Sequence, residues 1–261
     1  MILLLGGTSE TAPLAAACTA QGWQTLVSTA TDVPLELPVH PLLMRRHGRL
    51  NQQQMEQLIQ QEQVRVLVDA THPFATEAHT TALAAAAAAK IPCLRWQRTA
   101  CDCYEDEVVR VTGHQEAAQQ AVSFGSPILL TTGSRNLRPY TEAAQAAGIP
   151  LFARVLPHHE SAAACQQAGI PPEQVIAARG PFSAQETAEL INRLDIGVLV
   201  TKDSGAAGGL PEKLEAARRT GCRVILIHQP QQLDGCEAFA SITEIITAIA
   251  THLEQSCSNR K

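Results

Sequence analysis

Residues 1–22, MILLLGGTSETAPLAAACTAQG, decide the fold class of this chain. The apolar run from Met1 to Leu5 predicts a buried β-strand. Gly6 and Gly7 then permit a tight turn, and residues 10–21 predict a helix that ends near Gly22. A short buried strand followed at once by a helix is the unit from which parallel α/β sheets are built.

The same alternation of strands and helices continues along the chain. Further strands are predicted at 24–29, 65–69, 93–96, 127–131, 151–155, 175–178, 197–201 and 224–227, and helices at 51–61, 75–90, 137–147, 183–194, 210–220 and 241–253. The polar segment 97–107 interrupts this pattern, and 261 residues exceed the usual size of one domain. We therefore expect an α/β protein with parallel sheets and two domains, 1–100 and 101–261.

The composition narrows the classes of function. The net charge is −5 and the chain has no basic patch, which argues against a nucleic-acid partner. No segment approaches the roughly 20 apolar residues of a membrane helix. The chain starts directly with the predicted strand and without a basic leader, so we expect no membrane partner and a cytoplasmic location. Its eight cysteines include no Cys-x-x-Cys pair, which favours reduced structural thiols.

Ligands of open parallel sheets bind at the carboxyl ends of the strands, so the residues after each strand carry the functional signal. Gly6-Gly7-Thr8-Ser9-Glu10 follows the first strand. Glycines there let backbone amides approach an anion at the start of a helix. The alternative is an ordinary turn in which Thr8 or Ser9 caps the helix. The full Gly-x-Gly-x-x-Gly fingerprint is absent, so this loop alone does not decide between them.

A second polar strand end reads Asp69-Ala70-Thr71-His72-Pro73-Phe74. It places a carboxylate, a hydroxyl and an imidazole where a ligand is expected. Histidine is the side chain best suited to proton transfer near neutral pH, which makes His72 a candidate for that role. Taken singly, a histidine at a helix start is more often structural. The position after a parallel strand favours function.

Three further strand ends lie in the second half of the chain. They are Thr131-Thr132-Gly133-Ser134-Arg135, Arg179-Gly180-Pro181-Phe182 and Thr201-Lys202-Asp203-Ser204-Gly205. Each offers hydroxyls, a cationic side chain or backbone amides to an anionic group. Each is also compatible with an ordinary loop that uses glycine for its turn. Five such loops in one chain favour a binding site.

Several other classes of site find no support in the sequence. His158-His159-Glu160 lacks a suitably spaced third ligand, so we expect a solvated loop and no metal site. A short-chain dehydrogenase needs a Tyr-x-x-x-Lys pair, and neither Tyr104 nor Tyr140 has a lysine four residues later.

The strand ends, taken together, resemble the precorrin-6A and cobalt-precorrin-6A reductases of corrin (vitamin B12) biosynthesis. The resemblance covers nearly the whole chain in collinear order. Its motifs are GGTSE at 6–10, GRL at 48–50, DATHPFA at 69–75, LR at 94–95, TTG at 131–133, RGPF at 179–182 and TKDSG at 201–205. It implies two Rossmann-like domains with an active-site cleft between them, and NAD(P)H-dependent reduction of the precorrin-6A or cobalt-precorrin-6A macrocycle to its 6B form.

The resemblance also suggests roles for individual residues. Expected to bind the cofactor are Gly6, Gly7, Thr8, Ser9, Thr71, Thr132 and Gly133; expected to bind the substrate are Arg179, Gly180, Lys202, Ser204 and Gly205; expected to be catalytic are His72, Asp69 and Lys202. The tetrapyrrole carries many carboxylate arms, so cations such as Arg179 and Lys202 have an evident electrostatic task.

Two choices within that family remain open at this point. No arginine follows the second strand, where Asp32 can accept from a ribose hydroxyl, so the sequence favours NADH over NADPH. Arg45, Arg46 or Arg49 can still fold over a 2′-phosphate. The loop Gly205–Pro211 is longer than expected for the oxygen-dependent members, which favours the cobalt-containing substrate. The rival interpretation is a non-catalytic, regulatory nucleotide-binding protein. The oligomeric state is open.

Overall fold

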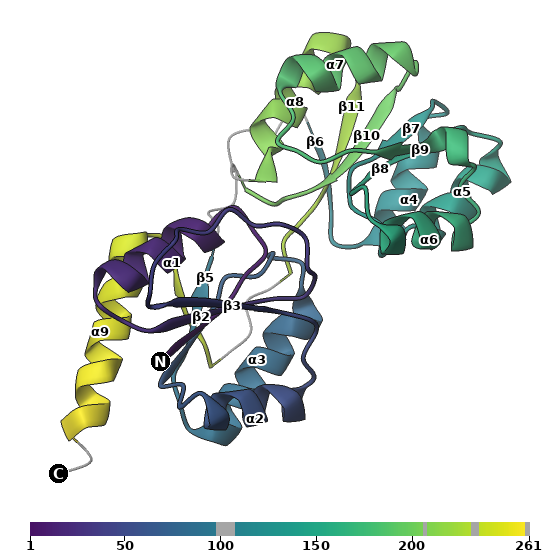
Figure 1. Cartoon of the computed structure of the whole chain (residues 1–261). Coiled ribbons are helices and arrows are strands. Elements are labelled where there is room, and N and C mark those ends of the chain that lie inside the picture. The colour runs from purple at the N-terminus through teal and green to yellow at the C-terminus, as the bar shows by residue number, and fades with distance from the viewer. Residues whose placement is uncertain (98–107, 206–207, 231–234, 259–261) are drawn as a thin grey trace. The chain divides into compact units, whose positions relative to one another are not determined.

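The computed structural model describes residues 1–97, 108–205, 208–230 and 235–258. The chain forms two compact units, one of Met1–Thr99 with Pro230–Lys261 and one of Ala100–Gln229. Each unit contains a six-stranded sheet with helices on both faces (Figure 1). The expected α/β class with two Rossmann-like domains is therefore confirmed.

The sheet of the first unit has the strand order β12-β5-β4-β1-β2-β3, and its strands pair in parallel. The strands are β1 (Ile2–Leu5), β2 (Thr25–Thr29), β3 (Leu43–His47), β4 (Val66–Asp69), β5 (Cys93–Trp96) and β12 (Glu237–Phe239). Leu5 lies level with both Ser28 and Asp69, and Asp69 lies level with Arg95. The loops after β1, β2 and β4 therefore leave the sheet side by side.

Helices cover both faces of this sheet, and the side chains of β1 alternate between the two cores that lie beneath them. Ile2 and Leu4 face α1 (Thr11–Ala20) and α9 (Ile242–Ser258), where they join Ile245 and Ile249. Leu3 and Leu5 join the core that α2 (Gln52–Gln61) and α3 (Thr76–Ala89) cover. A central strand that is buried on both faces has a continuous apolar sequence, as Met1 to Leu5 has.

The sheet of the second unit has the order β6-β11-β10-β7-β8-β9, again with parallel pairs. Its strands are β6 (Val108–Val111), β7 (Ile128–Leu130), β8 (Leu151–Val155), β9 (Val175–Ala177), β10 (Val198–Lys202) and β11 (Arg223–Ile227). One face carries α7 (Ala184–Arg193) and α8 (Leu210–Thr220); the other carries α4 (His114–Ser123), α5 (Arg138–Ala147) and α6 (His159–Gln167) (Figure 1). The short helix η1 (Pro172–Gln174) precedes β9.

The C-terminal segment lies in a different unit from the one that the sequence suggested. The boundary expected after residue 100 falls next to Thr99, but the expected second domain, 101–261, extends too far. From Pro230 the chain joins the first unit, where β12 pairs with β5 and α9 packs against α1. The three residues of β12 are half-buried or exposed at the sheet edge, so their pattern gives no sign of where they pair.

Candidate active site

The loop after β1 forms a turn around the Thr11 side chain. Thr11 is fully buried, and its Oγ1 accepts hydrogen bonds from the amides of Gly7 at 3.0 Å and Thr8 at 3.1 Å. The Gly6 amide donates to Ser28 O at 2.9 Å. A Cβ atom on Gly6 would lie 2.4 Å from Thr11 Cγ2, which explains the glycine. The residue that caps α1 is Glu10, without a side-chain cap, so neither Thr8 nor Ser9 is the N-cap.

This glycine loop contacts the loop that follows β4. Thr8 Oγ1 donates to Ala70 O at 3.0 Å, and the Ala70 amide donates to Leu5 O at 2.9 Å. The structure thus brings together two of the polar strand ends that the sequence singled out.

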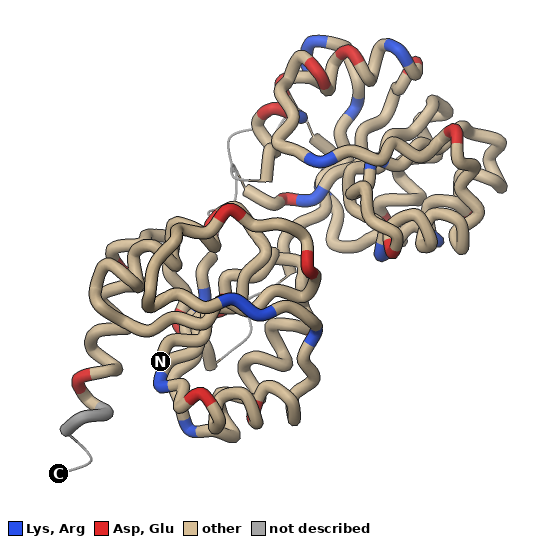
Figure 2. Tube along the Cα trace, in the orientation of Figure 1, with Lys and Arg blue, Asp and Glu red and all other residues tan. Residues whose placement is uncertain are grey.

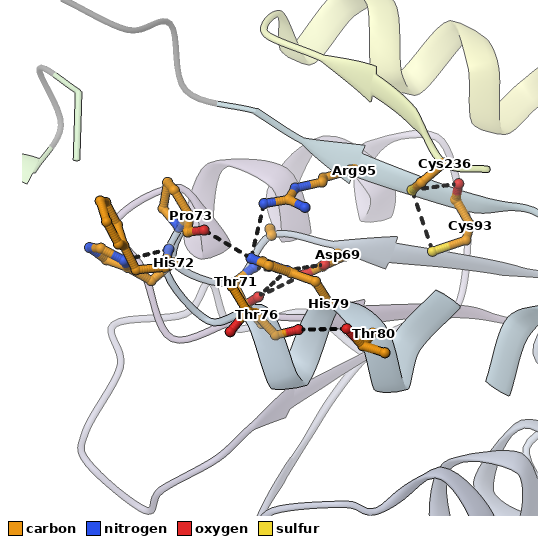
Figure 3. Close-up of polar contacts among 12 residues, drawn as sticks. Asp69, Thr71, His72, Pro73, Thr76, His79, Thr80, Cys93, Arg95 and Cys236 are labelled. Carbon is orange, nitrogen blue, oxygen red and sulfur yellow. Dashed lines mark hydrogen bonds and ion pairs between the residues drawn. The ribbon is translucent and has the colours of Figure 1, made fainter. Parts of the chain in front are cut away.

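Asp69 is buried at the end of β4, with 2% of its surface exposed. Its Oδ2 lies 2.6 Å from Nδ1 of His79, and its Oδ1 accepts from the Thr71 hydroxyl at 2.7 Å and the Thr71 amide at 3.1 Å (Figure 3). Burial acts to raise the pKa of Asp69, but the hydrogen bonds from His79 and Thr71 outweigh it and hold the pKa below its ordinary value. Asp69 is therefore an ionised carboxylate at neutral pH.

His79 extends this network toward β5. It lies in the first turns of α3 and is 4% exposed. Its Nε2 is 2.9 Å from Arg95 Nη2 and 3.2 Å from Pro73 O (Figure 3). The Nδ1 side of the ring bonds to Asp69, and the Nε2 side faces both the guanidinium of Arg95 and the Pro73 carbonyl oxygen. The network joins β4, α3 and β5, and it fixes the start of the loop that carries His72.

His72 itself lies outside this network. Its Nδ1 accepts from the Phe74 amide at 3.2 Å, and its ring lies 5.8 Å from the Phe74 ring, centroid to centroid. Figure 3 shows the imidazole apart from Asp69 and His79. The structure thus brings together Asp69 and Thr71, as the sequence suggested, but the histidine that bonds to them is His79. The sequence did not indicate His79 as a site residue, because it lies within an alanine-rich helix and not directly after a strand.

Two arginines lie beside the end of β2. Arg46 Nη1 donates to Ser28 Oγ at 2.6 Å and to Gly48 O at 3.0 Å. Arg45 Nη2 donates to Val33 O at 2.7 Å. Figure 2 shows this basic stretch along β3. Parallel pairing of β2 with β3, level at Ser28 and Arg46, places arginine next to the strand end where the sequence alone showed none.

In the second unit, Lys202 ends β10 and is half-buried. Burial, with a smaller contribution from the charge of Arg135, lowers its pKa to about 8. Burial and the charge of Lys202 lower the pKa of His114 to about 4, so this imidazole is neutral at pH 7. His114 Nδ1 lies 2.9 Å from the hydroxyl of Tyr140.

The expected residues around Lys202 lie on two neighbouring loops. β7 and β10 are adjacent, so Thr132 and Gly133 leave the sheet next to Lys202, Ser204 and Gly205. Thr132 is 7% exposed, and its hydroxyl has no hydrogen-bond partner among the residues that the structure describes. A buried hydroxyl without a partner is costly, so it is a candidate for contact with a polar ligand.

Arg179 and Gly180 follow β9 at the sheet edge, and β8 and β7 separate them from β10. Both are exposed. Sheet order therefore does not place them beside Lys202. Phe182, from the same loop, lies under the guanidinium of Arg154, 4.1 Å from its Cζ.

The expectation that residues 158–160 form a solvated loop is wrong, because the histidine pair lies at the start of a helix. His158 is the N-cap of α6, and its Nδ1 accepts from the Glu160 amide at 3.3 Å. Among the described residues, no group of three or more His, Cys, Asp or Glu side chains has a geometry that suits a metal ion. Within the same part of the chain, no helix combines the length and the apolar character of a membrane span.

These features define a class before any comparison: a two-unit, doubly wound α/β protein with polar, glycine-rich loops at the carboxyl ends of its strands. Residues 1–250 match the family model described as precorrin-6x reductase CbiJ/CobK, and the chain belongs to this family. It is an oxidoreductase that reduces precorrin-6A or cobalt-precorrin-6A in corrin biosynthesis, and its family implies a reduced nicotinamide as donor and a tetrapyrrole as substrate. The resemblance read from the motifs is confirmed.

Individual relatives agree with this family. The cobalt-precorrin-6A reductase of Priestia megaterium is 34% identical, over 95% of this chain and 98% of its own length. The precorrin-6A reductase of Rhodobacter capsulatus is 30% identical, over 88% of each chain. The solved structure of CobK precorrin-6A reductase is similar with a TM-score of 0.77 and 27% identity, over 96% of each chain. The rival interpretation of a non-catalytic regulatory protein is therefore set aside.

Proposed function

We propose that the first unit binds the reduced nicotinamide nucleotide at the paired loops after β1 and β4. The observation that carries this proposal is the hydrogen bond from Thr8 Oγ1 to Ala70 O, which holds the two loops against each other. The amides of Gly6, Gly7 and Thr8 donate within the protein, so these residues shape the turn. The Ser9 hydroxyl, which is exposed and donates to Glu10 Oε2 at 3.0 Å in the structure, and the N-terminal end of α1 are then the groups that hold a phosphate.

The loop after β4 borders the nicotinamide and handles the proton of the reduction. A bound reduced nicotinamide supplies a hydride. We assign proton transfer to His72, since its half-buried imidazole lies on this loop. Asp69 does not contact the ligands itself in this proposal, because it is buried and hydrogen-bonded to Thr71 and His79. It holds Thr71 beside the nucleotide and keeps the loop in place.

The second unit binds the acidic arms of the macrocycle. Lys202 supplies the charge that attracts a carboxylate, and the loops carrying Thr132, Gly133, Ser204 and Gly205 supply polar contacts around it. The buried Thr132 hydroxyl supports this assignment, because a ligand would complete its hydrogen bonding. Arg179 and Gly180 contact a more distant part of the same ligand from the end of β9.

We propose NADH as the donor. Asp32 follows β2, where its carboxylate can accept a hydrogen bond from a ribose hydroxyl. The arginines next to β2 support it, because Arg45 and Arg46 donate to nearby oxygen atoms of the protein itself. We propose the cobalt form as substrate, from the long loop after Gly205 and the similarity to the cobalt-precorrin-6A reductase of Priestia megaterium. We place the reaction in the cytoplasm, where nicotinamides and thiols are kept reduced.

The test is anaerobic incubation of the purified protein with precorrin-6A or with its cobalt form. Each macrocycle is combined with NADH or NADPH, and both nucleotide oxidation and the macrocycle spectrum are followed. We expect the fastest turnover with NADH and the cobalt form. A large advantage for NADPH would overturn the donor preference, and a faster reaction with metal-free precorrin-6A would overturn the substrate. No oxidation with any combination would reject the proposed function.

A further inference from the structure

Two cysteines of the first unit lie in contact, although 143 residues separate them along the chain. Cys93 is the first residue of β5, and Cys236 directly precedes β12. The Cys236 Sγ lies 3.5 Å from the Cys93 Sγ and 3.0 Å from the Cys93 carbonyl oxygen (Figure 3). Both are thiols in the structure, and neither belongs to the sites proposed above. The fold thus brings together a dithiol to which the reduction assigns no role.

The parallel pairing of β5 with β12 holds the two thiols together. Leu94 lies level with Glu237, and each cysteine directly precedes one of these two residues. Neighbouring strands lie about 4.8 Å apart, which falls within the range of Cα distances that disulfides span. The sulfur atoms must approach from 3.5 Å to about 2 Å to form a bond. Rotation of the two side chains can supply this approach, and the sheet can keep its pairing.

A hollow of about 460 Å³ is lined by both cysteines. Its wall also contains Leu83 and Ala86 of α3 and His252 of α9. Cys236 is half-buried, whereas Cys93 is only 9% exposed. A small solute in this hollow therefore reaches Cys236 first, and the Cys93 thiol lies within reach of the Cys236 sulfur.

We propose that Cys236 and Cys93 form a redox-active pair, which a low-molecular-weight disulfide such as oxidised glutathione converts to an intramolecular disulfide. The Cys236 thiolate attacks one sulfur of the small disulfide and displaces its first thiol. The Cys93 thiolate then attacks the Cys236 sulfur of this mixed disulfide and displaces the second thiol. The two protein thiols lose two electrons and two protons, and the small disulfide is reduced to two thiols that carry those protons. The second step is intramolecular, so the contact between the sulfur atoms favours it.

This disulfide joins the two parts of the chain that form the first unit. The chain leaves the unit after Thr99 and returns at Pro230, so the closed loop contains the whole second unit. A cross-link between residues far apart in the sequence restricts the unfolded chain and so stabilises the fold. The pair lies at the amino ends of its strands, and the candidate site lies at carboxyl ends, so we expect a change in stability and little change in turnover. In a reduced cytoplasm the pair stays a dithiol, and it closes when the thiol pool becomes oxidised.

The experiment incubates the full-length protein in glutathione buffers with an increasing oxidised fraction. Acid quenching, alkylation of the remaining thiols and peptide mapping by mass spectrometry then locate each disulfide. We expect a reversible disulfide between Cys93 and Cys236 and a Tm raised by about 5 °C or more over the reduced protein. Cys93→Ala should trap glutathione on Cys236, because the second thiol is missing. Cys222→Ala removes a buried thiol of the second unit, and as the matched control it should still form the disulfide.

Three results would count against this pair. Absence of the disulfide between Cys93 and Cys236 at every glutathione ratio overturns the proposal. Glutathione that stays on Cys236 of the wild type shows that Cys93 does not complete the exchange, which overturns it as well. Equal Tm values for the reduced and the oxidised protein overturn the stabilising effect. If Cys93→Ala does not fold, as judged by its thermal unfolding, Cys93→Ser replaces it. All these measurements use neither macrocycle nor nicotinamide, so they are independent of the proposed function.

Discussion

Asp69 shows how a buried carboxylate keeps its charge in this protein. Its two oxygens accept from His79 and Thr71, and these contacts hold its pKa below the ordinary value despite burial. A carboxyl whose pKa is lowered on folding stabilises the native state above its ordinary pKa. That stabilisation is lost as the pH falls through the lowered value.

We therefore expect Asp69→Asn to lower the free energy of unfolding by about 2 kcal/mol at neutral pH, because a charged hydrogen bond to His79 is lost. Urea denaturation measures the difference. The gap between wild type and variant should begin to narrow as the pH falls below about 4, the ordinary pKa of an aspartate, and close below the lowered pKa, where the native carboxyl is neutral as well. Asp195→Asn, at an exposed carboxylate, is the control. A gap that is the same at all pH values would contradict this role of the Asp69 charge.

His72 is the second prediction at this scale. His72→Ala should lower kcat by about a hundredfold, the usual contribution of a positioned proton-transfer group, and leave nucleotide affinity nearly unchanged. Steady-state rates and fluorescence titration of the nucleotide separate the two effects. His159→Ala, which removes an exposed imidazole, is the matched control. An unaltered kcat would remove His72 from the mechanism.

At the scale of the secondary-structure elements, the turn between β1 and α1 depends on the close approach of Gly6 to the Thr11 side chain. Gly6→Ala would place a Cβ atom 2.4 Å from Thr11 Cγ2 and displace the acceptor of the Gly7 and Thr8 amides. We expect a loss of about 1–3 kcal/mol in stability and weaker nucleotide binding, which calorimetric unfolding and titration would measure. Adding Thr11→Ser should restore part of both, since it removes Cγ2 and keeps the hydroxyl. Gly113→Ala, where nothing lies within 4 Å, is the control.

The elements that the sequence predicted are those whose composition reflects burial. β1, β4, β7 and β10 lie inside their sheets and are apolar on both faces, so their runs stand out. β3, β6 and β12 lie at sheet edges and are half-exposed, and none of the three was predicted; the fourth edge strand, β9, is also half-exposed but was predicted from its apolar run at 175–178. The helices α4 and α6 bury mainly small residues, so their apolar period is weak.

The candidate site, too, could be predicted from the sequence only in part. Loops at strand ends could be predicted, because a parallel sheet brings them to one edge. The contacts of Asp69 with His79 and of His79 with Arg95 could not. The first depends on how α3 packs beside β4, and the second on β4 and β5 being neighbours with Asp69 level with Arg95. Neither the packing of α3 nor the order of the strands can be deduced from the spacing of these residues in the sequence.

At the scale of the whole molecule, the C-terminal segment returns to the first unit and completes it. Ile245 and Ile249 of α9 are fully buried in the core that also contains Ile2 and Leu4. A chain that ends at Gln229 should therefore lose the cooperative unfolding of the first unit, because burial of each such side chain stabilises by about 1.5–3 kcal/mol. Limited proteolysis with mass spectrometry would locate the cleavages, which we expect within residues 1–99 and not within 108–205. Equal protection of both units would contradict this dependence.

The net charge of the whole protein is −5, and the tetrapyrrole substrate is rich in carboxylates, so the proposed binding relies on the few cations at the sheet edge. Lys202 has a pKa lowered to about 8, chiefly by burial. Its ammonium group is charged below that pH and becomes neutral above it. The KM for the macrocycle should therefore rise as the pH passes through 8, while the KM for the nicotinamide stays flat. Initial rates at saturating nicotinamide, measured on both sides of pH 8, give the profile.

Lys202→Arg separates this cause from general effects of alkali, because arginine keeps its proton throughout the range and should flatten the profile. A profile that keeps its full rise in Lys202→Arg would show that the Lys202 charge does not bind the carboxylates, and the acidic arms would then have to be held by other cations of the protein.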